Sequence, residues 1–248
     1  MSKKVIIAVA AAALAFSFGA KAQTNFQTFY DFGKDRKHVT TTLEGYYGDK
    51  WGDTFFFIDY DYNAKDSYTK KFVGVSGSYF EIARGLNFWK NSALKDLSAH
   101  VEYNGGVGFG SCNFLFGVNY FIHNADFSNT CTFELMYKTF NNGASSDVPL
   151  QLTVVWGMKN LFGLEGLTFS GFADLWGENT SYWYGDKNPL EAKEGKFIFL
   201  TEPQLWYNIG KTFGVDNLHI GTEIELSYNF AGCHGFYCRP CLGTKWIF

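Results

Sequence analysis

Apolar and polar residues alternate with a period of two along most of the chain after Gln23. In the segment TFFFIDYDYN (residues 54–63), one face carries Phe55, Phe57, Asp59 and Asp61, and the other carries Phe56, Ile58, Tyr60 and Tyr62. The segments SAHVEYN (98–104), CTFELMYKTF (131–140) and TEIELSYNF (222–230) repeat this arrangement. Alternation of this kind is typical of β-strands that have one polar and one apolar face.

Turn signals divide the alternating region into twelve predicted strands. Most are about 9–11 residues long, the length that a tilted strand needs to cross a bilayer. Their predicted ranges are 25–32, 38–48, 54–62, 71–83, 97–106, 112–122, 131–140, 150–158, 167–176, 196–208, 218–230 and 237–248. The weakest is 71–83, because Gly74, Ser76 and Ser78 fall on its supposed apolar face.

An even number of strands places both termini at one end of a closed barrel, as in single-chain bacterial barrels. With the termini in the periplasm, the segments GDKWGD, NADFSN, KNLFGLEG and GKTFGVDN become short periplasmic turns. The longest connection, residues 177–195, becomes extracellular, where such barrels carry their longer loops. The exception is residues 85–96, which form a long connection for a periplasmic turn.

The first residues have the features of a secretory signal peptide. Lys3 and Lys4 precede the apolar run 5–20, and Ala20-Lys21-Ala22 forms an A-x-A cleavage site. We therefore expect residues 1–22 to be a signal peptide and residues 23–248 to be one transmembrane β-barrel domain. After residue 23 no apolar stretch is long enough for a membrane-spanning helix.

Composition alone does not choose between a secreted β protein and an outer-membrane barrel, but the chemistry of the two strand faces favours a barrel in lipid over a soluble β-sandwich or lipocalin-like barrel. Phe, Tyr and Trp make up 20% of the residues, and the net charge of −3 gives no electrostatic footprint for nucleic acid. The polar faces repeatedly carry carboxylates, which would need costly pairing or protonation in a dry core but remain hydrated in a wet lumen. We therefore predict an all-β, twelve-stranded antiparallel barrel of the bacterial outer membrane, with its aromatic face toward lipid.

Three short stretches resemble a known family. WGDTFFFIDYDY (51–62) is similar to the aromatic strand with Trp and Asp of the nucleoside-specific (Tsx-like) channels, and ELSYNF (225–230) with the closing LGTKWIF (242–248) is similar to that family's ending. The terminal Phe248 also resembles the signal that outer-membrane barrels present to the barrel-assembly machinery. The resemblance implies a twelve-stranded barrel with a narrow pore, in which nucleosides pass between aromatic and ionisable side chains. The cysteine-rich final loop and the short outer loops depart from that family.

Face assignment gives a set of lumen residues that are candidates for substrate binding: Phe55, Phe57, Asp59, Asp61, Glu102, Glu134, Glu202, Glu223, Glu225 and Lys245. The basic residues on this face are fewer, and an excess of carboxylates favours cations or neutral hydrogen-bonding solutes over anions. The inward aromatics offer flat surfaces for stacking. The alternative is a structural role, in which these charges pair across strands and stabilise the barrel.

The sequence thus predicts a passive channel for small polar solutes, nucleosides among them, with outer-membrane lipid around it. Neither an enzyme nor a cofactor or metal is indicated, and a monomer suffices because a closed barrel leaves no edge strands. The alternatives are a plugged barrel with a structural or surface role and a barrel lipid hydrolase. Against hydrolysis, the chain contains neither G-x-S-x-G nor H-E-x-x-H. Ser98 and His100 do share a face, but near the predicted periplasmic end.

The chain has five cysteines, so an odd one remains after any pairing. Cys233, Cys238 and Cys241 lie in CHGFYCRPC, between the last two predicted strands. In an oxidising compartment Cys233 could pair with Cys238 or Cys241, or the thiols could stay free. With His234 the same three cysteines could instead bind zinc.

Overall fold

The structure is a computed structural model that describes residues 22–65, 68–107, 112–141, 144–182 and 193–248. The predicted signal peptide therefore lies outside the described residues, except for Ala22. Within the described ranges no helix is long and apolar enough to cross a membrane. The short helices present are two 3-10 turns, η1 (Leu161–Gly163) and η2 (Ile209–Phe213).

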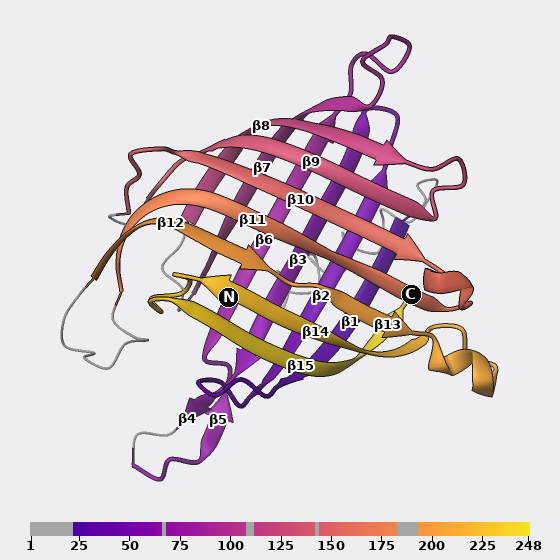
Figure 1. The fold of residues 1–248 in the computed structure, drawn as a ribbon. Helices are drawn as coiled ribbons and strands as arrows, with labels where there is room; N and C mark the ends of the chain where they lie inside the picture. Colours follow the sequence, from indigo (N-terminus) through magenta and orange to yellow (C-terminus); the bar gives the residue numbers. More distant parts are fainter. Residues whose placement is uncertain (1–21, 66–67, 108–111, 142–143, 183–192) are drawn as a thin grey trace, which may run out of the picture.

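The chain folds into a closed antiparallel β-barrel (Figure 1). Neighbouring wall strands pair in chain order, and β1 pairs with β15 to close the wall. The wall has twelve positions because β12 and β13 occupy one of them together. In order they are β1 (Ala22–Asp31), β2 (Val39–Gly48), β3 (Gly52–Tyr62), β6 (Gly77–Leu86), β7 (Leu97–Val107), β8 (Cys112–His123), β9 (Asn129–Lys138), β10 (Leu150–Lys159), β11 (Leu167–Tyr182), β12 (Lys193–Thr201) with β13 (Gln204–Tyr207), β14 (Leu218–Tyr228) and β15 (Phe236–Ile247).

Three predicted strands differ from the observed ones. The ninth, predicted at 167–176, continues to Tyr182 in β11, so the first part of the predicted connection 177–195 is strand. The fourth wall strand is β6 (77–86) instead of 71–83, and residues 72–74 (β5) pair with Ala64–Lys65 (β4) in a small separate hairpin. The tenth predicted strand, 196–208, is interrupted between β12 and β13 at Glu202 and Pro203. Proline has no N–H to donate to a sheet ladder, so the strand pairing breaks there and resumes at Gln204.

The two faces of the wall differ sharply in chemistry. Cross-strand register aligns Val118, Leu135, Leu152 and Leu175 in one row on the outside, and each of these side chains is more than two-fifths exposed. Exposure of such an apolar belt to water would be unfavourable, whereas its contact with the hydrocarbon of a membrane is favourable. Asp59 and Glu225 belong to the inner face, where Glu225 is 4% exposed. The predicted orientation of the faces is therefore confirmed.

The turn between β2 and β3 is held by one carboxylate. Asp49 accepts hydrogen bonds from the backbone N–H groups of Trp51 (2.7 Å) and Gly52 (3.0 Å). Nη2 of Arg84 donates to both carboxylate oxygens of Asp49, at 2.8 and 2.9 Å. The hydrogen bond from Arg84 lowers the pKa of Asp49 to about 2. This side chain links the turn to β6 at the end of the barrel that holds both termini.

We expect Asp49→Asn to lower the free energy of unfolding at neutral pH by no more than about 1 kcal/mol, because the pair with Arg84 is exposed and asparagine keeps the turn acceptor. The folded pKa lies below the unfolded value of about 3.9, so the contribution is complete above about pH 4 and declines as the pH falls toward 2. Urea unfolding of both proteins at several pH values measures this difference. A difference that persists unchanged at pH 2 would contradict the ion-pair explanation.

Candidate functional site

The candidate functional site is the lumen, because the predicted binding residues all face it. Register pairing carries the inner face from Asp59 to Tyr79 on β6 and from Glu81 to Asn104 on β7, and so on around the barrel. The predicted residues lie on five wall positions and at one strand break: Phe55, Phe57, Asp59 and Asp61 on β3, Glu102 on β7, Glu134 on β9, Glu202 between β12 and β13, Glu223 and Glu225 on β14, and Lys245 on β15. Their role in binding a solute stays a prediction.

On β3 and β6 aromatic rings line one strip of the lumen. The ring centroids of Phe55 and Phe57 are 5.9 Å apart, and those of Phe57 and Tyr79 are 5.6 Å apart. Next to this strip, Asp59 accepts a hydrogen bond from Thr42 (2.5 Å), and Asp61 accepts one from Thr40 (2.7 Å). We call Phe55, Phe57 and Tyr79 the aromatic strip.

A loop folds into the end of the lumen that lies opposite the termini. Asp35 and Arg36, between β1 and β2, reach wall residues: Arg36 Nη1 lies 2.7 Å from Glu225 Oε2, and Arg239 Nη2 lies 2.6 Å from Asp35 Oδ2. Arg239 also pairs with Glu225 and donates to Ser227 Oγ at 3.2 Å. We call Asp35, Arg36, Glu225 and Arg239 the loop latch. It ties the connecting segment between β1 and β2 to β14 and β15, the wall strands next to β1, at this end of the lumen.

A second polar group lies on β7 and β9. His100 Nε2 is 3.3 Å from Glu102 Oε2, and His100 Nδ1 is 3.8 Å from Glu134 Oε1. Glu102 and Asn104 are joined by a 3.0 Å hydrogen bond, as are Asn104 and Asn113 at 3.1 Å. We call His100, Glu102 and Glu134 the His–Glu cluster.

The considered Ser98–His100 pair does not fit lipid hydrolysis. Ser98 and His100 are 8% and 4% exposed and face the lumen, away from the surrounding lipid. The two ring nitrogens of His100 lie near Glu102 (3.3 Å) and Asn119 (3.4 Å), so the imidazole engages a carboxylate and an amide. His100 is therefore part of the interior hydrogen-bond network.

Two further polar groups lie on the inner face. Lys138 Nζ donates to Gln151 Oε1 (3.1 Å) and lies 4.1 Å from the ring centre of Trp176. On β13, Gln204 donates to Glu223 (2.6 Å) and accepts from Trp206 Nε1 (2.8 Å), so it links the acid to an indole. Lys245 Nζ lies 4.2 Å from the ring centre of Trp206.

The lumen is filled rather than wide. Gln27, Trp206, Ser227 and Arg239 are each 1% exposed although they face the inside of a barrel. A freely open lumen, as a simple diffusion channel would have, is thus not the conformation of this structure. The described conformation is constricted by side chains and by the loop latch.

The three cysteines near the C-terminus have different surroundings, and their pairing in an oxidising compartment stays a prediction. All five cysteines are unbonded in the structure. Cys241 faces the lumen and is 8% exposed, whereas Cys238 points to the outer face and is exposed, so these two thiols point away from each other. Cys233 is buried, with Sγ 3.4 Å from Arg239 Nη2. Among the described residues the group whose ligand atoms converge is the His–Glu cluster, and the cysteines with His234 do not form such a group.

Sequence patterns missed the loop latch. Asp35 and Arg36 lie in a connection, where no period applies, and the pairing of Asp35 with Arg239 joins residues 204 positions apart. The inner amides Asn104, Asn113 and Asn119 could have been found, because they share the polar face of their strands with Glu102.

Comparison with known families matches residues 22–248 to the family described as "Domain of unknown function (DUF5020)". The chain belongs to the DUF5020 family. A search among curated proteins finds no match to this DUF5020 protein.

Solved structures share its fold at low sequence identity. The NanC porin is 9% identical, with a TM-score of 0.52, covering 90% of this chain and 98% of its own. An active-site mutant of outer membrane phospholipase A from Escherichia coli is 11% identical, with a TM-score of 0.53 and coverages of 93% and 92%. The outer membrane phospholipase dimer with bound calcium from Salmonella typhi is 13% identical, with a TM-score of 0.54 and coverages of 93% for both chains.

These similarities identify the fold of the DUF5020 protein as that of outer-membrane barrels, and they include both a porin and a phospholipase. Together with the exposed apolar belt, they place the protein in the bacterial outer membrane as a multi-pass barrel. The resemblance to the Tsx-like channels is supported at the level of an outer-membrane barrel only, since the family that matches is DUF5020.

Proposed function

We propose that this DUF5020 protein is a narrow, gated channel for the passive uptake of small polar solutes, with a preference for cations and neutral hydrogen-bonding molecules. The acidic lumen wall carries this proposal. Carboxylates on the inner face outnumber the basic side chains His100, Lys138, Arg239 and Lys245, to which the loop contributes Arg36. Rings of carboxylate attract cations and repel anions in a pore.

Nucleosides are the solute class that the aromatic strip favours. Phe55, Phe57 and Tyr79 present neighbouring ring faces, and Asp59 is the register partner of Tyr79. A flat base can stack on such rings while a carboxylate accepts hydrogen bonds from the ribose hydroxyls. Small polar solutes without a flat ring would pass without using the strip.

The second candidate function is a plugged barrel with a structural role. The low exposure of the inner side chains, with Arg239 and Trp206 at 1%, favours it. Under this alternative the polar groups brace the wall and no solute crosses. The channel proposal instead treats the same groups as a closed state held by the loop latch.

Currents through planar bilayers test the channel directly. We expect the wild type and an Arg36→Ala variant, which loosens the latch, to pass current with cation selectivity in a salt gradient. Replacing Asp59 with Asn and Glu223 with Gln should reduce that selectivity, because both acids line the lumen. Glu165→Gln is the matched control, since Glu165 lies in a turn with a side chain 79% exposed.

Liposome swelling then tests the solute class. We expect Phe57→Ala to slow nucleoside entry while entry of small sugars is unchanged. If neither the wild type nor Arg36→Ala passes more current than the bare bilayer does, the channel proposal is wrong and the plugged barrel is supported. If current passes but nucleosides enter no faster than sugars of similar size, only the nucleoside part fails.

A further inference from the structure

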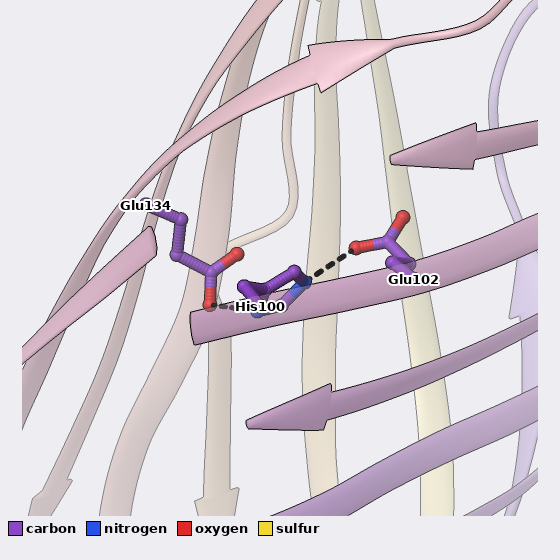
Figure 2. A group of neighbouring side chains, drawn as sticks. All are labelled: His100, Glu102 and Glu134. Carbon is purple, nitrogen blue, oxygen red and sulfur yellow. Dashed lines mark hydrogen bonds and ion pairs between the residues drawn. The ribbon is translucent and has the colours of Figure 1, made fainter. Parts of the chain in front are cut away.

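We propose that the His–Glu cluster is a binding site for one divalent transition-metal ion, for which Zn²⁺ is the natural probe. The cluster comes from two strands: His100 and Glu102 are two residues apart on β7 and face the same side, and Glu134 is supplied by β9 (Figure 2). One ligand atom from each residue can be chosen so that all three lie within 4.8 Å of one another. The inference goes beyond solute passage and does not depend on it.

One of the separations already suits a metal, and the other requires a carboxylate to move. Bonds of about 2.1 Å in a tetrahedral zinc site place ligand atoms roughly 3.4 Å apart. His100 Nε2 and Glu102 Oε2 are already 3.3 Å apart. Glu134 Oε1 approaches the other ring nitrogen, Nδ1, at 3.8 Å, so the Glu134 carboxylate must move around the imidazole to reach a metal on Nε2.

The direct register partners of His100 are both glycines, Gly85 on β6 and Gly117 on β8. The side chains nearest the imidazole therefore come from diagonal positions and from Asp53. A Cβ at Gly85 would lie only 2.5 Å from Asp53 Oδ1, which shows that the Asp53 carboxylate occupies the space over this glycine. That carboxylate adds negative charge beside the cluster.

Neighbouring amides can orient the ligands. Asn104 Nδ2 donates to Glu102 Oε1 at 3.0 Å, which leaves Oε2 for a metal. The amide of Asn119 lies 3.4 Å from His100 Nδ1. If the Asn119 amide is turned so that its oxygen faces that nitrogen, it accepts a hydrogen bond from Nδ1–H. The lone pair of Nε2 is then free for a metal, which is the usual arrangement of a metal-binding histidine.

Ligand chemistry and charge select the metal class. One imidazole nitrogen with two carboxylate oxygens suits Zn²⁺, Fe²⁺ or Mn²⁺ better than Ca²⁺ or Mg²⁺, which prefer oxygen alone. Two buried carboxylates and a neutral imidazole carry two negative charges, and a divalent ion neutralises them. The competing arrangement is a protonated imidazole between two carboxylates, which leaves one negative charge and binds no metal.

The test is zinc titration of the chelator-stripped full-length protein in detergent, followed by calorimetry. We expect one Zn²⁺ per chain, and an affinity at least roughly tenfold weaker in Glu134→Gln and in His100→Gln, because each removes a ligand. Glu223→Gln is the matched control, being a lumen carboxylate outside the cluster. Heat-dependent gel migration verifies that every variant is folded.

The cysteines require a separate variant because thiolates also bind zinc. A Cys233→Ser, Cys238→Ser and Cys241→Ser triple variant should keep the site, and X-ray absorption of the zinc-loaded protein should show nitrogen and oxygen ligands without sulfur. Zinc binding that is lost in the triple variant and kept in Glu134→Gln would overturn the proposal. Absence of binding by the folded wild type would overturn it as well and favour the protonated imidazole.

Discussion

Replacing Arg239 with alanine is expected to lower the free energy of unfolding by about 3–5 kcal/mol and to raise the conductance of the barrel. The guanidinium is 1% exposed and holds Asp35, Glu225 and Ser227 at once. Its loss leaves Asp35 without its wall partner and leaves Glu225 with Arg36 and the Ser227 hydroxyl. Both effects follow from one cause, because the residue that neutralises the buried acids also ties the loop to the wall at the end of the lumen.

Urea unfolding in vesicles and bilayer currents measure the two effects. Lys211→Ala is the control, since its 2.5 Å pair with Glu165 is solvent-exposed and should contribute little to stability. Arg239→Lys should fall between the wild type and the alanine variant, because lysine keeps the charge but lacks the planar fork that reaches several acceptors. A cost for Arg239→Ala no greater than that for Lys211→Ala would show that the latch is not a structural contact.

Acid should release the same latch. Burial raises the pKa of Asp35, but the hydrogen bonds and charge of Arg239 outweigh burial and hold its pKa below the usual value. A lowered folded pKa means that the contribution of the pair is complete above the unfolded value of about 3.9 and is lost as the pH falls through the folded value. We therefore expect wild-type conductance to rise below about pH 4, and the rise to be absent in Arg239→Ala.

The period-two pattern predicted the wall well because each strand of a barrel has one face in lipid and one in the lumen. It failed where that rule does not apply. At 71–83 the small residues Gly74 and Ser76 gave no clear face, and the chain there turns out of the wall before β6 begins at Gly77. At Pro203 the alternation of the sequence continues, but the hydrogen-bond ladder is interrupted because proline has no N–H to donate.

The candidate site divides in the same way. That His100 and Glu102 share a face follows from their spacing, but the approach of Glu134 depends on the register of β8 with both neighbours, which alternation does not fix. The loop latch is still less accessible to sequence reasoning. Its members are separated by about the whole length of the chain, and only barrel closure between β1 and β15 brings them together.

Trp206→Ala is expected to have the second large effect, again on both stability and conductance. Trp206 is the largest of the fully buried side chains described, with its indole 5.5 Å from the ring of Phe29, and a Cβ at Gly221 would lie 2.4 Å from it. Truncating a buried tryptophan typically costs about 3–5 kcal/mol, and water entering the polar lumen should keep this loss near the lower value. The removed ring volume then becomes water-filled space between Phe29 and Lys245.

Whether that space joins a path through the barrel separates the two candidate functions. In a gated channel the indole and the loop latch are obstacles in series, so Trp206→Ala should raise conductance further in the Arg239→Ala background. Trp156→Ala is the matched control, because Trp156 lies on the lipid face, as its register with Gly171 and Cys131 shows, and its truncation should leave conductance unchanged. A folded double variant that is less stable yet passes no more current than the bare bilayer would mean that the inner side chains brace a plugged barrel, since removing its largest buried ring and its latch had opened nothing.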